Sequence, residues 1–349
     1  MTSIFLNFKM LAIDNKSSIN WKNTSIMINE KYFKEVVIMF FRTDMAIERR
    51  DIFRKANKLE TEIPGIECNE ENLENMKITR VEIKTKEGEE ALNKKIGNYV
   101  TIDLKKMNYI PDEEKEKIVN ILSNEIGNII DKHIGKSDDI LVVGLGNLYS
   151  TPDALGSKVV KKIEITRHIK KYLPQYIDEN ARAISAIAPG VLGTTGIETL
   201  EFVKGIVENI KPKLVLVIDS LCSKSVDRIS KSIQLSDTGI VPGGGVGNAR
   251  LELTKETLKV PVVALGIPTV IDAVTLVEDG IDIWLNNLEN TKNNDIVEEI
   301  VNVRNFAENN ESNSIKNALI PTDLNFIVTP KEIDELIENM TEIVACRYK

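Results

Sequence analysis

Residues 140–156 read ILVVGLGNLYSTPDALG, and this stretch decides the fold class that the sequence predicts. It opens with an apolar, β-branched run, Ile140–Val143, which is typical of a buried strand. Gly144 and Gly146 allow the main chain to leave that strand sharply, because glycine accepts positive φ and close approach. Turn-forming residues follow, and a helix is expected from about Ala154. A strand, a glycine-rich turn and a helix in this order indicate one unit of an open α/β sheet, whose ligands bind at the carboxyl ends of the strands.

Two interpretations of Asp153, in the turn before that helix, stay open. As an N-cap, its carboxylate would accept hydrogen bonds from the free N–H groups of the helix. As a functional group, it would lie at the carboxyl edge of the sheet with Asp219, which follows a second apolar run, Leu214–Ile218. Two neighbouring carboxylates cannot both ionise, so one keeps a proton while the other can activate water. Asn147, in the same turn as Asp153, is a candidate contact to substrate.

Strand and helix signals alternate from about residue 98 to residue 278. Apolar runs predict strands at 78–85, 99–104, 140–143, 183–187, 214–218 and 262–265. Helical spacing, acidic first turns and prolines predict helices at 112–130, 155–172, 198–210 and 269–278, and a last one from Pro330 to about Val344. This order predicts an α/β fold, with a doubly wound, mostly parallel sheet and helices on both faces.

Shifts in composition suggest the domain boundaries. Residues 1–44 are rich in Asn, Lys and Ser, lack long periodicity and are expected to form a leader. Residues 45–349 are expected to form a single α/β domain, in which the Asn-, Glu- and Lys-rich stretch near 285–325 is an exposed insertion. A chain of 349 residues is long enough for such a domain.

The composition also disfavours several classes of function. A net charge of −8 argues against a nucleic-acid-binding surface, and no apolar run is long enough to cross a membrane. The three cysteines are scattered and the N-terminus has no export-signal pattern, so the cytoplasm is the predicted compartment. The two histidines, His133 and His168, are too few for a multi-histidine metal site.

Three further features are weaker candidates for a site. Asp237 belongs to an Asp-Thr-Gly run, as in pepsin-like proteases, but those all-β enzymes need the run twice, so Asp237 is kept only as a residue that lines the site. The loop with Gly243, Gly244 and Gly245 would let the main chain approach a substrate, or would simply pack tightly. Cys222 has no histidine near it in sequence and is expected to pack rather than to act as a nucleophile.

Nine short motifs occur along the chain in a fixed order. They are RTDMAIE (42–48), VGLGN (143–147), TPDALG (151–156), APGVLG (188–193), TGIET (195–199), IDSL (218–221), IQLSDTG (233–239), GVGN (245–248) and PTVIDA (268–273). Together they resemble the germination protease family of spore-forming Firmicutes. The resemblance covers about residues 42–345.

This resemblance implies an endopeptidase that degrades small acid-soluble spore proteins during germination. It implies two catalytic aspartates, which fall on Asp153 and Asp219 in this sequence, and no metal or other cofactor. It also implies a fold similar to that of the hydrogenase maturation endopeptidases, in agreement with the alternation of strands and helices. Two departures from the family pattern, SLCSK at 220–224 and Gly244 in place of a common serine, lie near the expected site and bear on specificity.

The resemblance further implies a homotetrameric zymogen in the spore core that removes its own N-terminal segment. The matching processing site is the bond between Asp44 and Met45, and residues 43–48 follow a substrate-like pattern of acidic, apolar, alanine, variable and glutamate positions. A leader that carries such a sequence into the site would explain self-cleavage. Two other classes stay open, namely a metal-dependent maturation-type peptidase on the same fold and a peptide-binding module without activity.

Overall fold

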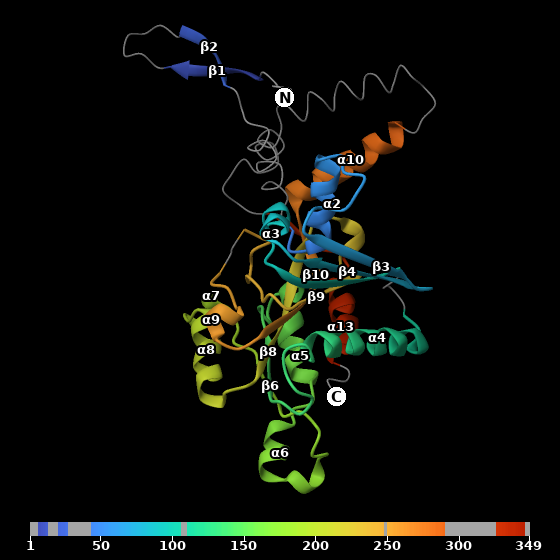
Figure 1. Cartoon of the computed structure of the whole chain (residues 1–349), viewed down its shortest axis with the longest axis vertical. Coiled ribbons are helices and arrows are strands. Elements are labelled where there is room, and N and C mark those ends of the chain that lie inside the picture. Colours follow the sequence, from blue (N-terminus) through green and yellow to red (C-terminus); the bar gives the residue numbers. More distant parts are fainter. Residues whose placement is uncertain are drawn as a thin grey trace.

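The computed structural model describes residues 6–12, 20–26, 43–105, 110–247, 250–289 and 326–345. Within these residues, nine strands form one sheet in the order β3-β4-β5-β9-β10-β8-β6-β7, and β11 pairs with the end of β10 (Figure 1). The strands are β3 (Ile66–Asn72), β4 (Met76–Ile83), β5 (Gly97–Leu104), β6 (Ile140–Gly144), β7 (Ile184–Ile187), β8 (Leu214–Ser223), β9 (Ser232–Ser236), β10 (Val262–Asp272) and β11 (Ile327–Val328). Two more, β1 (Leu6–Ala12) and β2 (Asn20–Ile26), form an antiparallel hairpin.

Helices and short turns connect these strands. The α-helices are α2 (Ala46–Ala56), α3 (Lys86–Leu92), α4 (Asp112–Ile130), α5 (Leu155–Lys162), α6 (Arg167–Tyr172), α7 (Leu192–Thr195), α8 (Thr199–Ile210), α9 (Lys255–Leu258), α10 (Ala273–Glu289) and α13 (Ile333–Ala345). The 3-10 turns are η1 (Thr151–Asp153), η2 (Pro174–Tyr176) and η3 (Val226–Arg228). No helix among the described residues is both long and apolar enough to span a membrane.

The sheet has a parallel half and an antiparallel half. β10, β8, β6 and β7 are parallel neighbours. β3, β4, β5 and β9 pair antiparallel, and β9 joins the two halves through antiparallel pairing with β10. The predicted α/β fold is confirmed, and its parallel part lies where the continuous apolar runs predict it.

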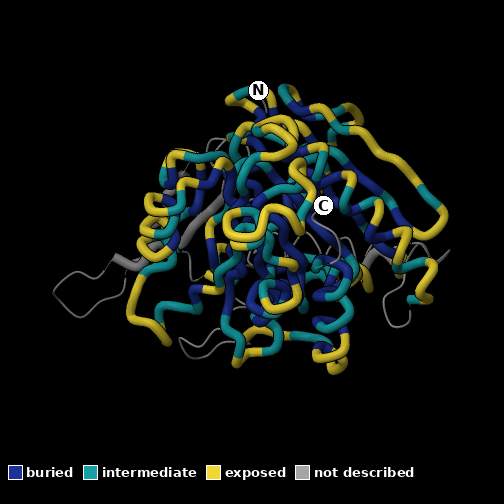
Figure 2. Tube along the Cα trace, turned by 90° about the horizontal axis from the view of Figure 1, so that it is seen from below, coloured by how far each residue is buried: buried dark blue, intermediate teal, exposed yellow. Residues whose placement is uncertain are grey.

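Helices cover both faces of the parallel half because its central strands are apolar on both sides. Leu214, Leu216 and Ile218 of β8 belong to the core beneath α4, α5 and α13. Val215 and Val217 belong to the core on the opposite face, with α8 and α9 (Figure 1). A strand directs successive side chains to opposite faces, so a run without polar residues is the pattern of a strand covered twice. Figure 2 shows that buried segments of the chain lie mostly in the interior and that exposed segments lie around them.

A smaller core joins α2 and α3 to the antiparallel half. Met45 and Ile47 are buried in it together with Val81 and Ile83 of β4 and with Leu92 of α3. Side chains that follow position 44 are therefore fixed in the folded body by apolar packing.

Two predicted helices differ from the structure by more than three residues at one or both ends, and the last, expected from Pro330, begins at Ile333. The prediction of one helix at 155–172 is wrong, since α5 ends at Lys162 and α6 begins at Arg167. Between them, the Thr166 hydroxyl donates to the carbonyl of Arg182 and accepts the N–H of the β7 residue Ile184, which turns the chain out of the helical path. Local helical spacing does not reveal a contact of this kind.

The second difference is the predicted helix at 269–278, which begins only at Ala273. β10 continues to Asp272 because it stays paired with β8, through a register shift between Pro268 and Val270. The strand predicted at 214–218 likewise continues, to Ser223.

The domain boundaries stay predictions. Of the expected leader, the structure describes residues 6–12, 20–26, 43 and 44, and of the expected insertion near 285–325 it describes the end of α10; the rest of both lies outside the described residues.

Candidate active site

Asp153 and Asp219 line the same cavity, of about 660 Å³, at the carboxyl end of β6. β6 pairs with β8 as far as Gly144, opposite Ile218, so Asp219 is the first residue of β8 beyond the end of β6. The turn that follows β6 fills this position and carries Asp153. The structure thus brings together the two carboxylates that the sequence predicts at one edge of the sheet.

Two glycines allow this close approach. A Cβ on Gly156, in the first turn of α5, would lie 2.4 Å from the carbonyl oxygen of Ile218 and 2.5 Å from the main-chain nitrogen of Leu145. Gly146 has a φ of +98°, and a Cβ there would lie 1.9 Å from the carbonyl oxygen of Asp153. The helix and the turn therefore pack on β8 without room for another side chain.

The N-cap interpretation of Asp153 is wrong. Asp153 ends the 3-10 turn η1, and the cap position of α5 is occupied by Ala154, whose side chain cannot cap. The Thr269 hydroxyl of β10 donates to the carbonyl of Pro152 at 2.7 Å and fixes the turn. The carboxylate of Asp153 instead accepts the N–H of Asn147, at 2.8 Å, at the wall of the cavity.

The two carboxylates have different surroundings. Asp219 is 6% exposed, whereas Asp153 is half-buried. Burial raises the pKa of Asp219 well above its ordinary range, and the neighbouring carboxylates of Asp153 and Asp44 raise it further. Burial also raises the pKa of Asp153, but its bond from Asn147 acts in the opposite direction. The surroundings of Asp219 therefore favour its protonated form more strongly than those of Asp153 do.

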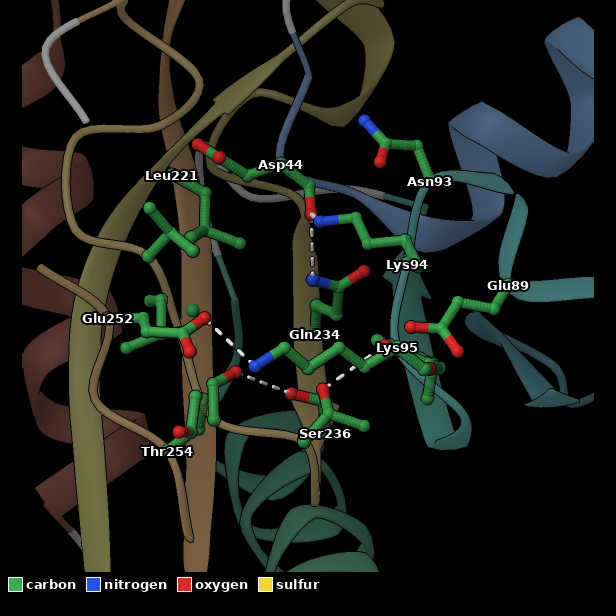
Figure 3. A pocket seen from close by; sticks show the side chains of 17 residues that line it. Asp44, Glu89, Asn93, Lys94, Lys95, Leu221, Gln234, Ser236, Glu252 and Thr254 are labelled. Atoms are coloured by element: carbon green, nitrogen blue, oxygen red, sulfur yellow. Dashed lines mark hydrogen bonds and ion pairs between the residues drawn. The ribbon is translucent and has the colours of Figure 1, made fainter. Parts of the chain in front are cut away.

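A third carboxylate, Asp44, also lines this cavity. Its main-chain N–H donates to the carbonyl of Cys222 at 3.0 Å, and its side chain accepts the N–H of Cys222 at 2.9 Å. On the other side of residue 44, Lys94 Nζ and Gln234 Nε2 donate to the Asp44 carbonyl oxygen, at 2.7 Å and 3.2 Å (Figure 3). The chain at the predicted processing bond is thus held in place from two sides.

Glu48, the second acidic residue of the substrate-like segment, is buried by a separate set of donors. Its carboxylate accepts the Ser223 hydroxyl at 2.8 Å and the main-chain N–H groups of Lys224 and Ser225 at 2.7 Å and 3.1 Å. Arg228 Nε lies 3.7 Å from it. These contacts attach the first turn of α2 to the end of β8.

The predicted glycine-rich loop lies against the same site. Gly243 lines the cavity, as does Asn147. A Cβ on Gly245 would be 2.2 Å from the Asp44 carboxylate, whereas a Cβ on Gly244 would be 3.2 Å from the carbonyl oxygen of Val241 and 3.6 Å from that carboxylate. The loop therefore packs tightly against Asp44, and its approach to a substrate stays a prediction.

Asp237 is not brought to the two aspartates. Among the described residues its carboxylate accepts the N–H and the side-chain amide of Asn98, at 2.8 Å and 2.7 Å, and His133 Nε2 lies 3.5 Å away. The direction of its strand explains this position: β9 runs antiparallel to β10 and β8, so its carboxyl end lies at the opposite edge of the sheet. Cys222 is buried, as expected, and burial raises the pKa of its thiol to about 12.

Two residues of the site carry no recognisable sequence signal. Lys94 follows α3 in a stretch outside every motif. Gln234 lies in the motif at 233–239, but in that motif Asp237 is the residue with a recognisable functional pattern. In the part of the chain that the structure describes, no three His, Cys, Asp or Glu side chains gather as the ligands of a metal ion would.

Comparisons with known proteins agree with the motifs. A family model described as germination protease matches residues 43–302. The germination proteases of Caldanaerobacter subterraneus subsp. tengcongensis and Clostridium perfringens strain 13 are 42% and 43% identical to this chain; the matches cover 89% and 87% of it and 93% and 92% of the relatives. A crystal structure of a NiFe hydrogenase maturation protease from Thermococcus kodakarensis KOD1 matches 40% of this chain and 80% of its own, with 18% identity and a TM-score of 0.26. The expected resemblance is confirmed, and this chain belongs to the germination protease family.

Proposed function

We propose that the chain is an endopeptidase whose catalytic pair is Asp153 and Asp219. One observation carries the proposal: both carboxylates line one cavity, and the charge of Asp153 raises the pKa of the more deeply buried Asp219. Carboxylates placed in this way share a proton at neutral pH and can supply a base and an acid to the same reaction.

In this mechanism Asp153 is the general base and Asp219 the general acid. Asp153 is the more exposed member, and the N–H of Asn147 stabilises its charge, so it takes a proton from water. The water oxygen bonds to the carbonyl carbon, the C–N bond breaks, and the departing nitrogen takes the proton that Asp219 holds. Transfer of the proton from Asp153 to Asp219 then restores the starting state.

The first bond to be cut is the bond between Asp44 and Met45 of the chain itself. Asp44 lines the cavity of the pair, while Met45 and Ile47 are fixed in the core beside it. Cleavage there would release residues 1–44 and leave α2 in place. We further propose that the chain forms a homotetrameric zymogen in the spore core and that the processed enzyme degrades small acid-soluble spore proteins.

The intact mass of the full chain, followed during incubation, tests this function. The wild-type protein should lose the mass of residues 1–44, whereas Asp153→Asn and Asp219→Asn, each of which replaces a titratable oxygen by an amide, should keep it. Asp237→Asn is the matched control, because that carboxylate serves Asn98 at the other edge of the sheet. If either Asp153→Asn or Asp219→Asn loses residues 1–44 as fast as the wild type, the proposal is refuted. Activity that a chelator removes and a metal ion restores would favour the metal-dependent alternative.

A further inference from the structure

Asp44 is held by groups that are separate from the catalytic pair. It lines the cavity of Asp153 and Asp219 and also a second cavity, of about 390 Å³, so it stands where the two meet. In Figure 3 its carbonyl oxygen faces Lys94 and Gln234, while its carboxylate points the other way. The two polar ends of one residue are therefore bound by two different sets of donors.

The groups around the Asp44 carboxylate favour an acidic side chain at this position. The main-chain N–H groups of Cys222 and Gly245 donate to it, and a main-chain N–H can only donate. Burial raises the pKa of Asp44, and the positive charges of Lys94 and Arg49 act in the opposite direction and favour its ionised form. Because Gly245 has no side chain, there is room for the Asp44 carboxylate, which a Cβ at position 245 would overlap. A side-chain amide in the same place would gain less from these charges.

The main chain around the bond is held by Gln234 and Lys94. Gln234 Nε2 donates to the Asp44 carbonyl oxygen at 3.2 Å, and its Oε1 accepts the N–H of Ala46 at 2.7 Å, so one side-chain amide spans the bond. Lys94 Nζ reaches the same carbonyl oxygen at 2.7 Å. A cation at this oxygen would stabilise the negative charge that develops when water adds to the carbonyl carbon. Burial lowers the pKa of Lys94 to about 8, which leaves it mostly charged at neutral pH.

We infer that these groups form a subsite for an acidic residue directly before the scissile bond, in which Lys94 and Gln234 hold the carbonyl that is attacked. The inference rests on the proposed function and names the residues that select its substrates. In the uncut chain Asp44 fills the subsite. Cleavage releases Asp44 with the leader, whereas Glu48 stays bound at the end of β8, so the subsite is emptied for the next peptide while the new N-terminal segment remains anchored.

Substitution at position 44 in the full chain tests the selection of the side chain. Asp44→Asn keeps the shape and removes the charge, and it should slow the first-order loss of residues 1–44 about 30-fold, because a hydrogen bond to a charged group contributes about 2 kcal/mol. Gly245→Ala places a methyl group where the Asp44 carboxylate lies. In the Gly245→Ala protein, Asp44→Asn should therefore no longer slow the loss of residues 1–44. A residue with a merely structural role would not change the ratio of the two rates.

Substitution of Lys94 tests the hold on the carbonyl. Lys94→Met should slow self-cleavage by about 30-fold or more, and Lys94→Arg should restore part of the rate, because a cation again reaches the oxygen. Lys170→Met is the matched control: Lys170 Nζ also donates to a carbonyl oxygen, that of Ala181, at 2.7 Å, but it lines neither cavity. Its rate should stay within about twofold of the wild type, since no contact to the cleaved segment is lost.

The outcomes separate the subsite from the proposed function. If the wild-type chain is cleaved and Asp44→Asn is cleaved equally fast, the subsite is overturned and the catalytic pair stands. If a folded Lys94→Met protein loses residues 1–44 as fast as the wild type, the role of Lys94 is overturned. If Lys94→Met does not fold, the substitutions at position 44 still test the subsite. A wild-type chain that never loses residues 1–44 overturns the proposed function and the subsite with it.

Discussion

Gly156 provides a sharp test of how the two aspartates are brought together. It lies in the first turn of α5, and a Cβ there would meet main-chain atoms, the carbonyl oxygen of Ile218 at 2.4 Å and the nitrogen and oxygen of Leu145 at 2.5 Å. Ordinary contact begins at 3.4 Å, so Gly156→Ala must move α5 away from β8 by about 1 Å. Main-chain atoms cannot rotate aside as the end of a side chain does.

Both stability and activity should fall. We expect Gly156→Ala to lower the free energy of unfolding by about 2 kcal/mol, as overpacking of a core does. The same movement carries the turn with Asp153 away from Asp219, and a displacement of about 1 Å should reduce the rate of self-cleavage about 100-fold. Urea unfolding measures the first quantity, and the loss of residues 1–44, followed by intact mass, measures the second.

A second helical glycine supplies the control. A Cβ on Gly205, in α8, would meet no described atom within 4 Å. Gly205→Ala should therefore stabilise the protein by about 0.5–1 kcal/mol through helix propensity and leave the rate of cleavage unchanged. If Gly156→Ala were as stable and as active as Gly205→Ala, the account of the close packing at α5 would be refuted.

Three further substitutions have defined outcomes. The pKa of Asp219 in the folded protein lies above its unfolded value, so the wild type loses stability as pH rises through that folded pKa. Asp219→Asn should therefore be the more stable protein at pH 7. The thermal unfolding curves of the two proteins should converge below about pH 4. No difference in stability at pH 7 would contradict the raised pKa of Asp219 in the folded protein. Glu48→Ala removes an acceptor of the Ser223 hydroxyl and of the main-chain N–H groups of Lys224 and Ser225, and it should lower the free energy of unfolding by about 2 kcal/mol. A loss below about 0.5 kcal/mol in urea would argue against that anchor. Asp237→Ala removes both acceptors of the Asn98 N–H groups and should lower the free energy of unfolding by about 2 kcal/mol, while self-cleavage stays within about twofold of the wild-type rate. Loss of cleavage in the folded Asp237→Ala protein would indicate that Asp237 belongs to the active site.

The parallel core and its two aspartates are predictable from the sequence because they follow from local patterns. Ile140–Val143 and Leu214–Ile218 are continuous apolar runs, as strands buried on both faces must be. Parallel strands present their carboxyl ends at one edge, which places Asp153 and Asp219 together without knowledge of the side-chain contacts.

The remainder depends on contacts between distant parts of the chain. The bond of Asp44 to Cys222 spans 178 residues and that to Lys94 spans 50, and no local pattern encodes either. Asp237 is misplaced by sequence reasoning because the direction of β9 is fixed by its antiparallel neighbours β5 and β10. The predicted helix start at Thr269 fails for a similar reason, since pairing with β8 keeps this segment in a strand.

The most direct test of the central claim is a double-mutant cycle on the rate at which the full chain loses residues 1–44. Residues that act as one unit are strongly non-additive, so Asp153→Asn and Asp219→Asn should each slow cleavage at least about 1000-fold, and the double variant should be no slower than either. A single variant within about tenfold of the wild type, or losses that simply add in free energy, would contradict a shared role of the two carboxylates.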